Sequence, residues 1–175
     1  MGDKEYQRNI SKNVNSIKMY QTLIKIRDLL KESLSGKIKY FFIDDPNLIP
    51  AGALPCLAIV PVSTDTNVAD TGRDIHTRTI DIILIISAKD ELNKFAKEVV
   101  GTQFLCDIME GEDENGNLKN YTVLYTLRKN LDLGNNWMIQ NISAVDYGLR
   151  SRPEQGLTKE ASIRITVARI SNRPS

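Results

Sequence analysis

The chain has 175 residues, of which 41% are hydrophobic and 26% are charged. That length suits one domain, and the hydrophobic content is too high for a chain that stays disordered throughout. The 23 lysines and arginines are balanced by 22 aspartates and glutamates, which excludes binding of polyanions through bulk charge, so any electrostatic contact must come from local patches.

The first part of the chain predicts one helix followed by strands. Residues 1–10 are polar and are expected to form a flexible arm, and residues 11–175 are expected to form a single domain. Apolar residues recur at a helical spacing up to Gly36, which predicts a helix over 15–35. The next predicted elements are a strand over 38–43, a proline-rich loop over 44–55, a strand over 56–62, a polar turn region over 63–72 and a strand over 74–87.

The strand predicted over 74–87 is long and has two different halves. Its fourteen residues span about 46 Å at ~3.3 Å per residue, which exceeds the width of a small domain. The first half is mostly polar, whereas the second half carries Ile80, Ile82 and Leu84 on one face and Ile83 on the other. A strand that is apolar on both faces is covered on both sides. We therefore expect a hairpin whose base lies in the core and whose polar end projects into solvent or onto a partner.

The second part of the chain predicts two helices and two further strands. Apolar residues at a helical spacing predict a helix over 90–109, with Asp90 as its N-cap. Residues 121–131 fit either a helix or a strand, and we favour a short helix. The other predicted elements are an acidic turn over 110–117, a strand over 137–147, a loop over 151–157 and a strand over 160–171. This order indicates an α+β fold with a mostly antiparallel sheet and helices packed on one face.

Cys56 and Cys106 are the only cysteines, and each lies in an apolar segment. Free cysteines are among the most buried residue types, so we expect two reduced, structural thiols and folding in a reducing cytoplasm. A disulfide or a metal site is the alternative, but the chain has no Cys-x-x-Cys pattern and only one histidine, His76. The polar N-terminus and the short apolar runs predict neither a signal peptide nor a membrane span.

No pattern of residues predicts catalysis or cofactor binding. The glycine-rich loops that hold phosphates do not occur in the chain. A hydrolase triad would need His76, which we interpret as a surface histidine on a strand beside Arg78. A metal-dependent nuclease would need converging carboxylates such as Asp44, Asp45 and Asp81, which we interpret as turn and strand-edge charges. We therefore predict a protein that is not an enzyme and has no catalytic, cofactor-binding or metal-binding residues.

Charge is concentrated in three parts of the chain. Residues 1–40 carry a net charge of +5, residues 107–114 hold five acids and no base, and residues 145–175 carry a net charge of +3. These parts are either solvated faces, or the acidic turn of one molecule meets the basic surface of a neighbour in a head-to-tail contact. The residues expected at such a subunit or tube interface are Arg73, Asp74, Arg78, Glu112, Asp113, Glu114, Arg150 and Arg152.

A family resemblance rests on the order of six segments and on their patterns of apolar and polar residues. These are SIKMYQTLIKIRDLL (16–30), LPCLAIVPV (54–62), GRDIHTRTIDIILIIS (72–87), YTVLYTLRKNL (121–131), AVDYGLRSR (144–152) and ASIRITVARI (161–170). In this order they resemble the tail terminator proteins of long-tailed bacteriophages, the lambda-type terminator group. The resemblance covers about residues 11–171, and the N-terminal arm and the long turn over 110–120 are additional to it.

The resemblance implies an α+β fold and a hexameric ring that caps the tail tube at its set length and then presents a surface to the head. The implied partners are further copies of the chain, the major tail tube protein and a head–tail connector protein, with no membrane and no sequence-specific nucleic acid. The implied location is the tail end near the neck of the virion, after assembly in the host cytoplasm. The alternatives are a head–tail connector or neck protein, a small metal-dependent nuclease and a nucleic-acid-binding module.

Overall fold

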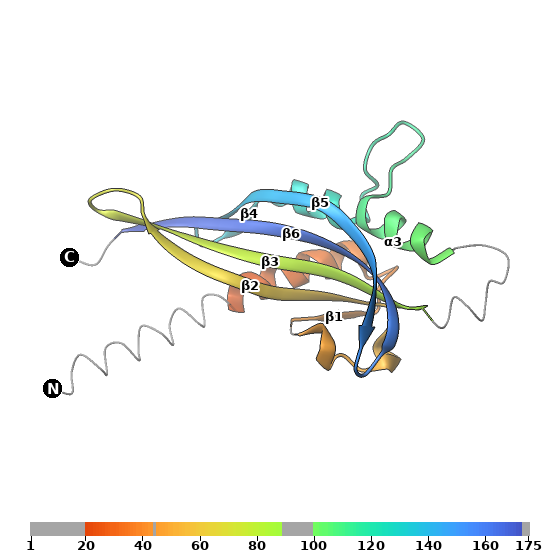
Figure 1. Cartoon of the computed structure of the whole chain (residues 1–175). Helices are drawn as coiled ribbons and strands as arrows, with labels where there is room; N and C mark the ends of the chain where they lie inside the picture. The colour runs from red at the N-terminus through yellow and green to blue at the C-terminus, as the bar shows by residue number, and fades with distance from the viewer. Residues whose placement is uncertain (1–19, 44, 89–99, 173–175) are drawn as a thin grey trace.

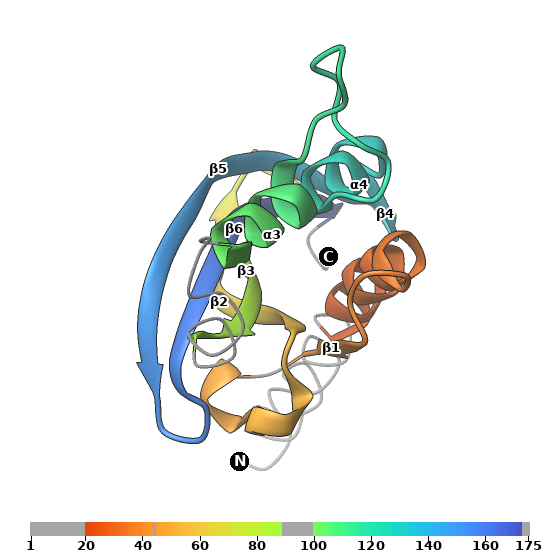
Figure 2. The same ribbon diagram turned by 90° about the vertical axis from the view of Figure 1, so that its right-hand side faces the viewer.

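The computed structural model describes residues 20–43, 45–88 and 100–172. The predicted arm, the beginning of the first predicted helix, Asp44 and residues 90–99 of the second predicted helix lie outside this part of the chain. In the described part, long strands form a curled sheet, and helices lie against one of its faces (Figures 1 and 2).

The helices and strands of the described residues alternate irregularly along the chain. The N-terminal helix is described over 20–34, and it is followed by β1 (Tyr40–Phe42), the 3-10 helices η1 (Pro46–Leu48) and η2 (Ala51–Ala53), β2 (Cys56–Val68), β3 (Arg73–Ser87), α3 (Val100–Glu110), α4 (Val123–Lys129), β4 (Asp132–Gly134), β5 (Trp137–Arg152) and β6 (Gly156–Asn172). The strands lie in the order β1-β2-β3-β6-β5-β4. Only β1 and β2 run parallel, and the other neighbouring pairs are antiparallel, which confirms the predicted α+β fold.

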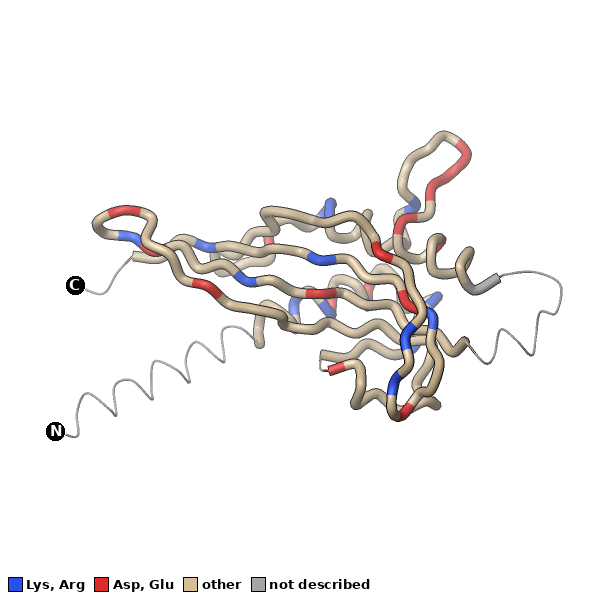
Figure 3. The backbone as a smooth tube through the Cα atoms, viewed as in Figure 1, with Lys and Arg blue, Asp and Glu red and all other residues tan. Residues whose placement is uncertain are grey.

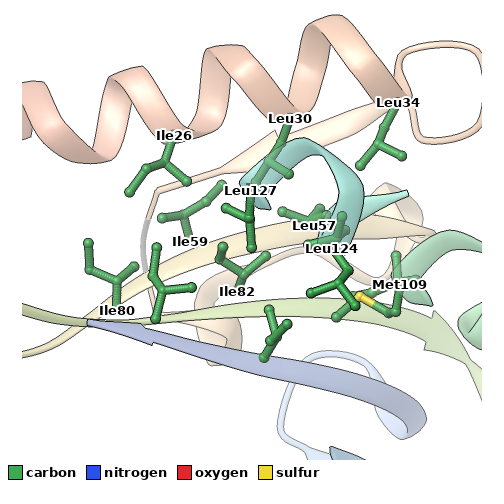
Figure 4. Packing of buried hydrophobic residues seen from close by; sticks show 14 of the residues in the cluster. Ile26, Leu30, Leu34, Leu57, Ile59, Ile80, Ile82, Met109, Leu124 and Leu127 are labelled. Atoms are coloured by element: carbon green, nitrogen blue, oxygen red, sulfur yellow. The ribbon is translucent and has the colours of Figure 1, made fainter. Parts of the chain in front are cut away.

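The N-terminal helix covers the middle of the sheet with one apolar stripe. Leu23, Ile26, Leu30 and Leu34 follow one another at three or four residues and are at most 4% exposed. Figure 4 shows Ile26, Leu30 and Leu34 pointing from the helix toward the sheet. Side chains of α3 and α4 belong to the same hydrophobic cluster, so these helices form one layer over one face of the sheet, as predicted.

The apolar half of β3 is buried on both faces of the sheet. Ile80, Ile82 and Leu84 are fully buried under the helices, and Ile85 is fully buried on the opposite face. On that opposite face, the loop that carries η1 and η2 contributes to a second, smaller cluster around Cys56. The expectation of a strand covered on both sides is therefore confirmed for this end of β3.

The polar half of β3 is an interior strand of the sheet, with a neighbour on each side. β3 pairs with β6 along its whole length and with β2 as far as Val68, which lies opposite Asp74. Residues 63–68 thus form strand rather than turn, because each finds a partner on β3 and threonine and valine favour strands. The turn is confined to 69–72, where the amide of Gly72 donates to Asp70 Oδ1 at 2.9 Å.

The C-terminal hairpin is also longer than predicted. β5 and β6 extend the ladder into the predicted loop over 151–157, and only residues 153–155 remain between the strands. β4 was not predicted, and it joins β5 through Asn135 and Asn136, which adopt φ values of 54° and 62°. Asparagine tolerates this left-handed conformation better than most residues, so the pair suits a tight turn between strands.

The ambiguous segment over 121–131 contains α4, so the favoured short helix is confirmed. The helix begins after Thr122, whose hydroxyl oxygen accepts a hydrogen bond from the amide of Tyr125 at 3.2 Å. Such a threonine cap stabilises the first turn and overrides the strand preference of the threonine, valine and tyrosine residues nearby.

Candidate assembly surface

The sheet has an open edge on each side. On one side β1 pairs with β2 only over residues 56–58, so among the described residues no strand lies beside β2 over 59–68. On the other side β4 pairs with β5 only at residues 137–138, so no described strand lies beside β5 over 141–152. An open edge presents unpaired backbone amides and carbonyls, which are suited to pairing with another strand.

The two open edges lie at opposite ends of the sheet. The open part of β2 is level with the beginning of β3 and the end of β6, whereas the open part of β5 is level with the beginning of β6 and the end of β3. Figure 1 shows the first edge near the turn between β2 and β3, and the second near the turn between β5 and β6. The edges therefore form two different surfaces, as a head-to-tail contact requires.

Beyond Pro61, the open edge of β2 has few of the features that usually prevent strands from associating. Residues 61–68 are all exposed, and Val62 and Val68 are 47% and 71% exposed. Pro61 and the register shift between Pro61 and Ser63 protect the beginning of this edge. Beyond them, residues 63–68 carry only one charge, that of Asp65, and no lysine. This stretch is therefore suited to pairing with a second chain.

Arg73 and Asp74 lie where β3 begins, at the projecting end of the sheet. Arg73 is exposed and its Nε donates to Asp70 Oδ2 at 2.7 Å, which holds the pKa of Asp70 below its usual value. Asp74 is half-buried and faces neighbouring strands on both sides. The position of both residues at the open end agrees with a role in contacts, while Arg73 also closes the turn.

Arg78 is buried within its own chain, so the expectation that it lies on a contact surface is wrong. Arg78 is only 4% exposed. Its Nη1 donates a hydrogen bond to Thr22 Oγ1 at 3.3 Å, and its guanidinium carbon lies 4.0 Å from the centre of the Trp137 ring. Burial and the nearby Arg169 lower the pKa of Arg78 to about 10. Arg78 shares a face with Ile80 because side chains alternate along a strand, and that parity was the signal in the sequence.

The acidic turn projects from the body of the molecule between α3 and α4 (Figures 2 and 3). Glu112, Asp113 and Glu114 are all exposed. Asp113 Oδ1 accepts hydrogen bonds from the amides of Asn117 and Asn115, both at 2.9 Å, and these bonds lower the pKa of Asp113. The carboxylate of Asp113 therefore stabilises the shape of the loop, whereas Glu112 and Glu114 are exposed at the surface.

Arg152 and Arg150 have different environments, although the sequence suggested one basic loop. The guanidinium of Arg152 binds the carboxylate of Glu160, with Nη2 at 2.7 Å from Oε2, and the two side chains are 12% and 8% exposed. Arg152 Nη1 also donates to Asn47 Oδ1 at 2.9 Å, which joins the β5–β6 hairpin to η1. Arg152 is thus already paired within its own chain, and Arg150 is the exposed arginine of the two.

The carboxylates considered for a nuclease do not converge in the described residues. Asp81 is bound by Arg164, whose Nε and Nη2 donate at 2.7 and 2.8 Å. Asp45 caps η1 by accepting from the amide of Asn47, and Asp44 lies outside the described residues. No group of three or more histidine, cysteine, aspartate or glutamate residues that could hold a metal ion occurs in the described part of the chain.

His76 is half-buried between two hydroxyl groups on the helix-covered side of the sheet. Its Nε2 lies 2.7 Å from Ser171 Oγ, and its Nδ1 lies 3.0 Å from Thr66 Oγ1. Burial, together with Arg169, lowers the pKa of His76 and favours the neutral ring. A serine nucleophile would need a carboxylate on the far nitrogen to stabilise the imidazolium, and here a threonine hydroxyl occupies that position.

Cys56 and Cys106 are both free thiols, as expected. Cys56 is fully buried, whereas Cys106 is only half-buried, so the expectation of two buried thiols holds for Cys56 alone. Burial, and secondarily the carboxylate of Glu160, raise the pKa of Cys56 to about 12. Cys56 is therefore a protonated, unreactive core residue at neutral pH.

This raised pKa predicts a loss of stability in alkaline solution. Because the thiol of Cys56 ionises near pH 9.0 in the unfolded chain and near pH 12 in the folded chain, its contribution is complete below pH 9.0 and declines as the pH rises toward 12. Urea unfolding at several pH values above 9.0 should show a steeper fall in unfolding free energy for the wild type than for Cys56→Ala. Identical slopes for the two proteins would contradict the burial of this thiol.

Comparisons with known proteins provide no further assignment. No model of a protein family matches the chain, and no curated protein matches it. Among the described residues, no helix combines the length and the apolar character needed to cross a membrane. The features that bear on function are therefore the open edges, the charged loops and the residues around Trp137.

Proposed function

We propose that the chain is a non-enzymatic structural protein of a bacteriophage virion that assembles into a hexameric ring. The ring caps the end of the tail tube, ends polymerisation of the tube and provides the surface to which the head is joined. The resemblance of the six sequence segments to tail terminators motivates this proposal, and the two open edges of the sheet are the structural observation that carries it.

The direction of the edge strands is compatible with a ring. β2, β3, β6 and β5 are successive antiparallel neighbours, so β2 and β5 run in opposite directions. If the rotation axis runs roughly along the strands, β2 of one copy and β5 of the next are therefore antiparallel, and their open parts are level with each other at residues 59–63 and 141–145. Repetition of the same heterologous contact closes into a ring if the rotation allows, and a closed ring leaves no edge exposed.

The proposed partners are further copies of the chain, the major tail tube protein and a head–tail connector protein. Assembly takes place in the host cytoplasm, and the ring then lies at the tail end near the neck of the virion. A connector or neck protein would also form a ring through these edges, and the two roles differ in what the ring binds. Capping of a growing tube supports the terminator role, whereas binding to heads without capping supports the connector.

Lysines on the open edge of β2 should prevent ring formation. Ser63 and Asn67 are exposed on this edge, and Ser63→Lys with Asn67→Lys would add two charges that a neighbouring strand would have to desolvate. In sedimentation velocity we expect the wild type to form rings and the double variant to remain monomeric with an unchanged melting temperature. Thr71→Lys adds a charge to the exposed turn of the same hairpin and is the matched control, which should form rings. Ring formation by the double variant would remove this edge from the interface.

A further inference from the structure

A pocket of about 450 Å³ lies beside the turn between β4 and β5. Its walls include Thr22 from the N-terminal helix, Asn135 and Asn136 from the turn, Trp137 from β5 and Arg169 from β6. These segments are far apart in the sequence, which is why no local pattern predicted the pocket. Trp137 forms the apolar wall and is 2% exposed.

Arg169 is the one charged residue among the described walls of the pocket, and Arg78 lies close to it on the same indole ring. The guanidinium carbons of Arg78 and Arg169 lie 4.0 and 5.0 Å from the centre of the same indole ring, so two positive charges share one aromatic partner. Among the described residues, Arg169 takes part in no ion pair, and its buried Nε has no hydrogen-bond acceptor. A guanidinium that lines a pocket and whose buried Nε has no acceptor is suited to a planar oxyanion, because a carboxylate can accept from a guanidinium in two parallel hydrogen bonds.

The acidic turn of a second copy fits this requirement. Several other carboxylates are engaged within the chain: Asp70 with Arg73, Asp81 with Arg164, Asp107 with Lys119, Glu110 with Tyr147, and Glu160 with Arg152. Glu112 and Glu114 are exposed and lie on a narrow loop that Asp113 holds in shape before any partner binds. Figures 1 and 2 show this loop projecting away from the sheet, so it is available to another molecule.

We propose that the turn Glu112–Glu114 of one copy inserts a carboxylate into the pocket of the neighbouring copy, where Arg169 binds it beside Trp137. This contact rests on the proposed ring, and it supplies the register that backbone pairing along a sheet edge leaves weakly specified. In the predicted head-to-tail contact of acidic and basic surfaces, the arginine that binds the acidic turn is then Arg169 rather than Arg78 or Arg152.

Trp137 is the only tryptophan in the chain, so its fluorescence reports directly on the pocket. A donor protein with Trp137→Phe keeps the acidic turn and has no tryptophan, and an acceptor protein with Glu112→Gln and Glu114→Gln keeps the pocket. Adding the donor to the acceptor should change the Trp137 emission in a saturable way, and the affinity should fall as salt is added. Arg169→Gln in the acceptor should weaken donor binding about tenfold or more.

The matched control is a donor that carries Trp137→Phe together with Glu112→Gln and Glu114→Gln. It has the same fold and edges as the first donor, and it should leave the emission of the acceptor unchanged. An equal change with both donors, or no change with the first donor, would overturn the proposal.

A second measurement does not depend on the tryptophan. Asn136→Cys in one copy and Glu114→Cys in another should form a disulfide between copies, whereas Asn136→Cys and Leu48→Cys, with Leu48 on the exposed surface of η1, should not. Rings that form normally without the specific disulfide and without a response from Trp137 would overturn this contact and leave the proposed function standing. A response from Trp137 in a protein that forms no ring would support the contact and contradict the proposed function.

Discussion

Replacing Leu84 with alanine should lower the free energy of unfolding by about 2–5 kcal/mol, the usual range for a buried leucine. Leu84 is fully buried on β3, opposite Leu57 of β2 and Ala161 of β6. Paired backbone on both sides and the helix layer above prevent the surroundings from collapsing into the space that the side chain leaves. The loss of packing should therefore appear in full in a urea melt.

Leu48→Ala is the matched control for this substitution. Leu48 is 68% exposed on η1, and the same change of side chain there should alter the unfolding free energy by no more than about 0.5 kcal/mol. A loss below about 0.5 kcal/mol for Leu84→Ala as well would show that β3 does not form the centre of the core.

Removing the carboxylate of Glu160 should lower the free energy of unfolding by about as much as Leu84→Ala does. Glu160→Ala leaves the guanidinium of Arg152 mostly buried and without its anion, and breaking such a pair typically costs about 3–5 kcal/mol. The same carboxylate also accepts a hydrogen bond from Thr158 Oγ1 at 2.8 Å, which is lost with it. The hairpin end that η1 holds through Arg152 should loosen, and the open edge of β5 should lose its shape.

The double variant Arg152→Met with Glu160→Leu separates the unpaired charge from the loss of packing. Replacing both members of a buried pair with apolar residues of similar volume is often nearly neutral, so the double variant should be more stable than Glu160→Ala alone. A double variant that is less stable than the single variant would show that the ion pair itself holds the hairpin in place. Thermal unfolding of the three proteins, measured side by side, decides between these outcomes.

The parts of the fold that depend on local patterns were predictable from the sequence. In the strand predicted over 160–171 apolar residues alternate along 161–167, and in the first predicted helix they recur at a helical spacing up to Leu34; both local patterns match the burial that the structure shows. Residues 63–68 were predicted as turn because their composition favours turns, and the strand forms because β3 provides a partner for each of them. Such pairing is a property of two segments together and is invisible in either one alone.

The charged residues of the candidate surface were harder to predict for the same reason. Arg152 and Glu160 are eight residues apart and meet only because the hairpin register brings them together. The pocket around Trp137 unites segments that range from Thr22 to Arg169, so its cationic character depends on tertiary structure alone. Arg78 differs, because its position in the alternation of β3 already placed it on the buried face.

We propose that copies of the chain join head to tail through the two edges of the sheet and close into a ring. The most direct test is the mass and shape of the purified full chain, measured by light scattering and averaged electron-microscope images, with and without tail tube protein. We expect a closed hexameric ring that binds the end of a tube and stops its growth. A monomer under all these conditions, or a two-fold dimer in which the edge of β2 pairs with itself, would contradict it.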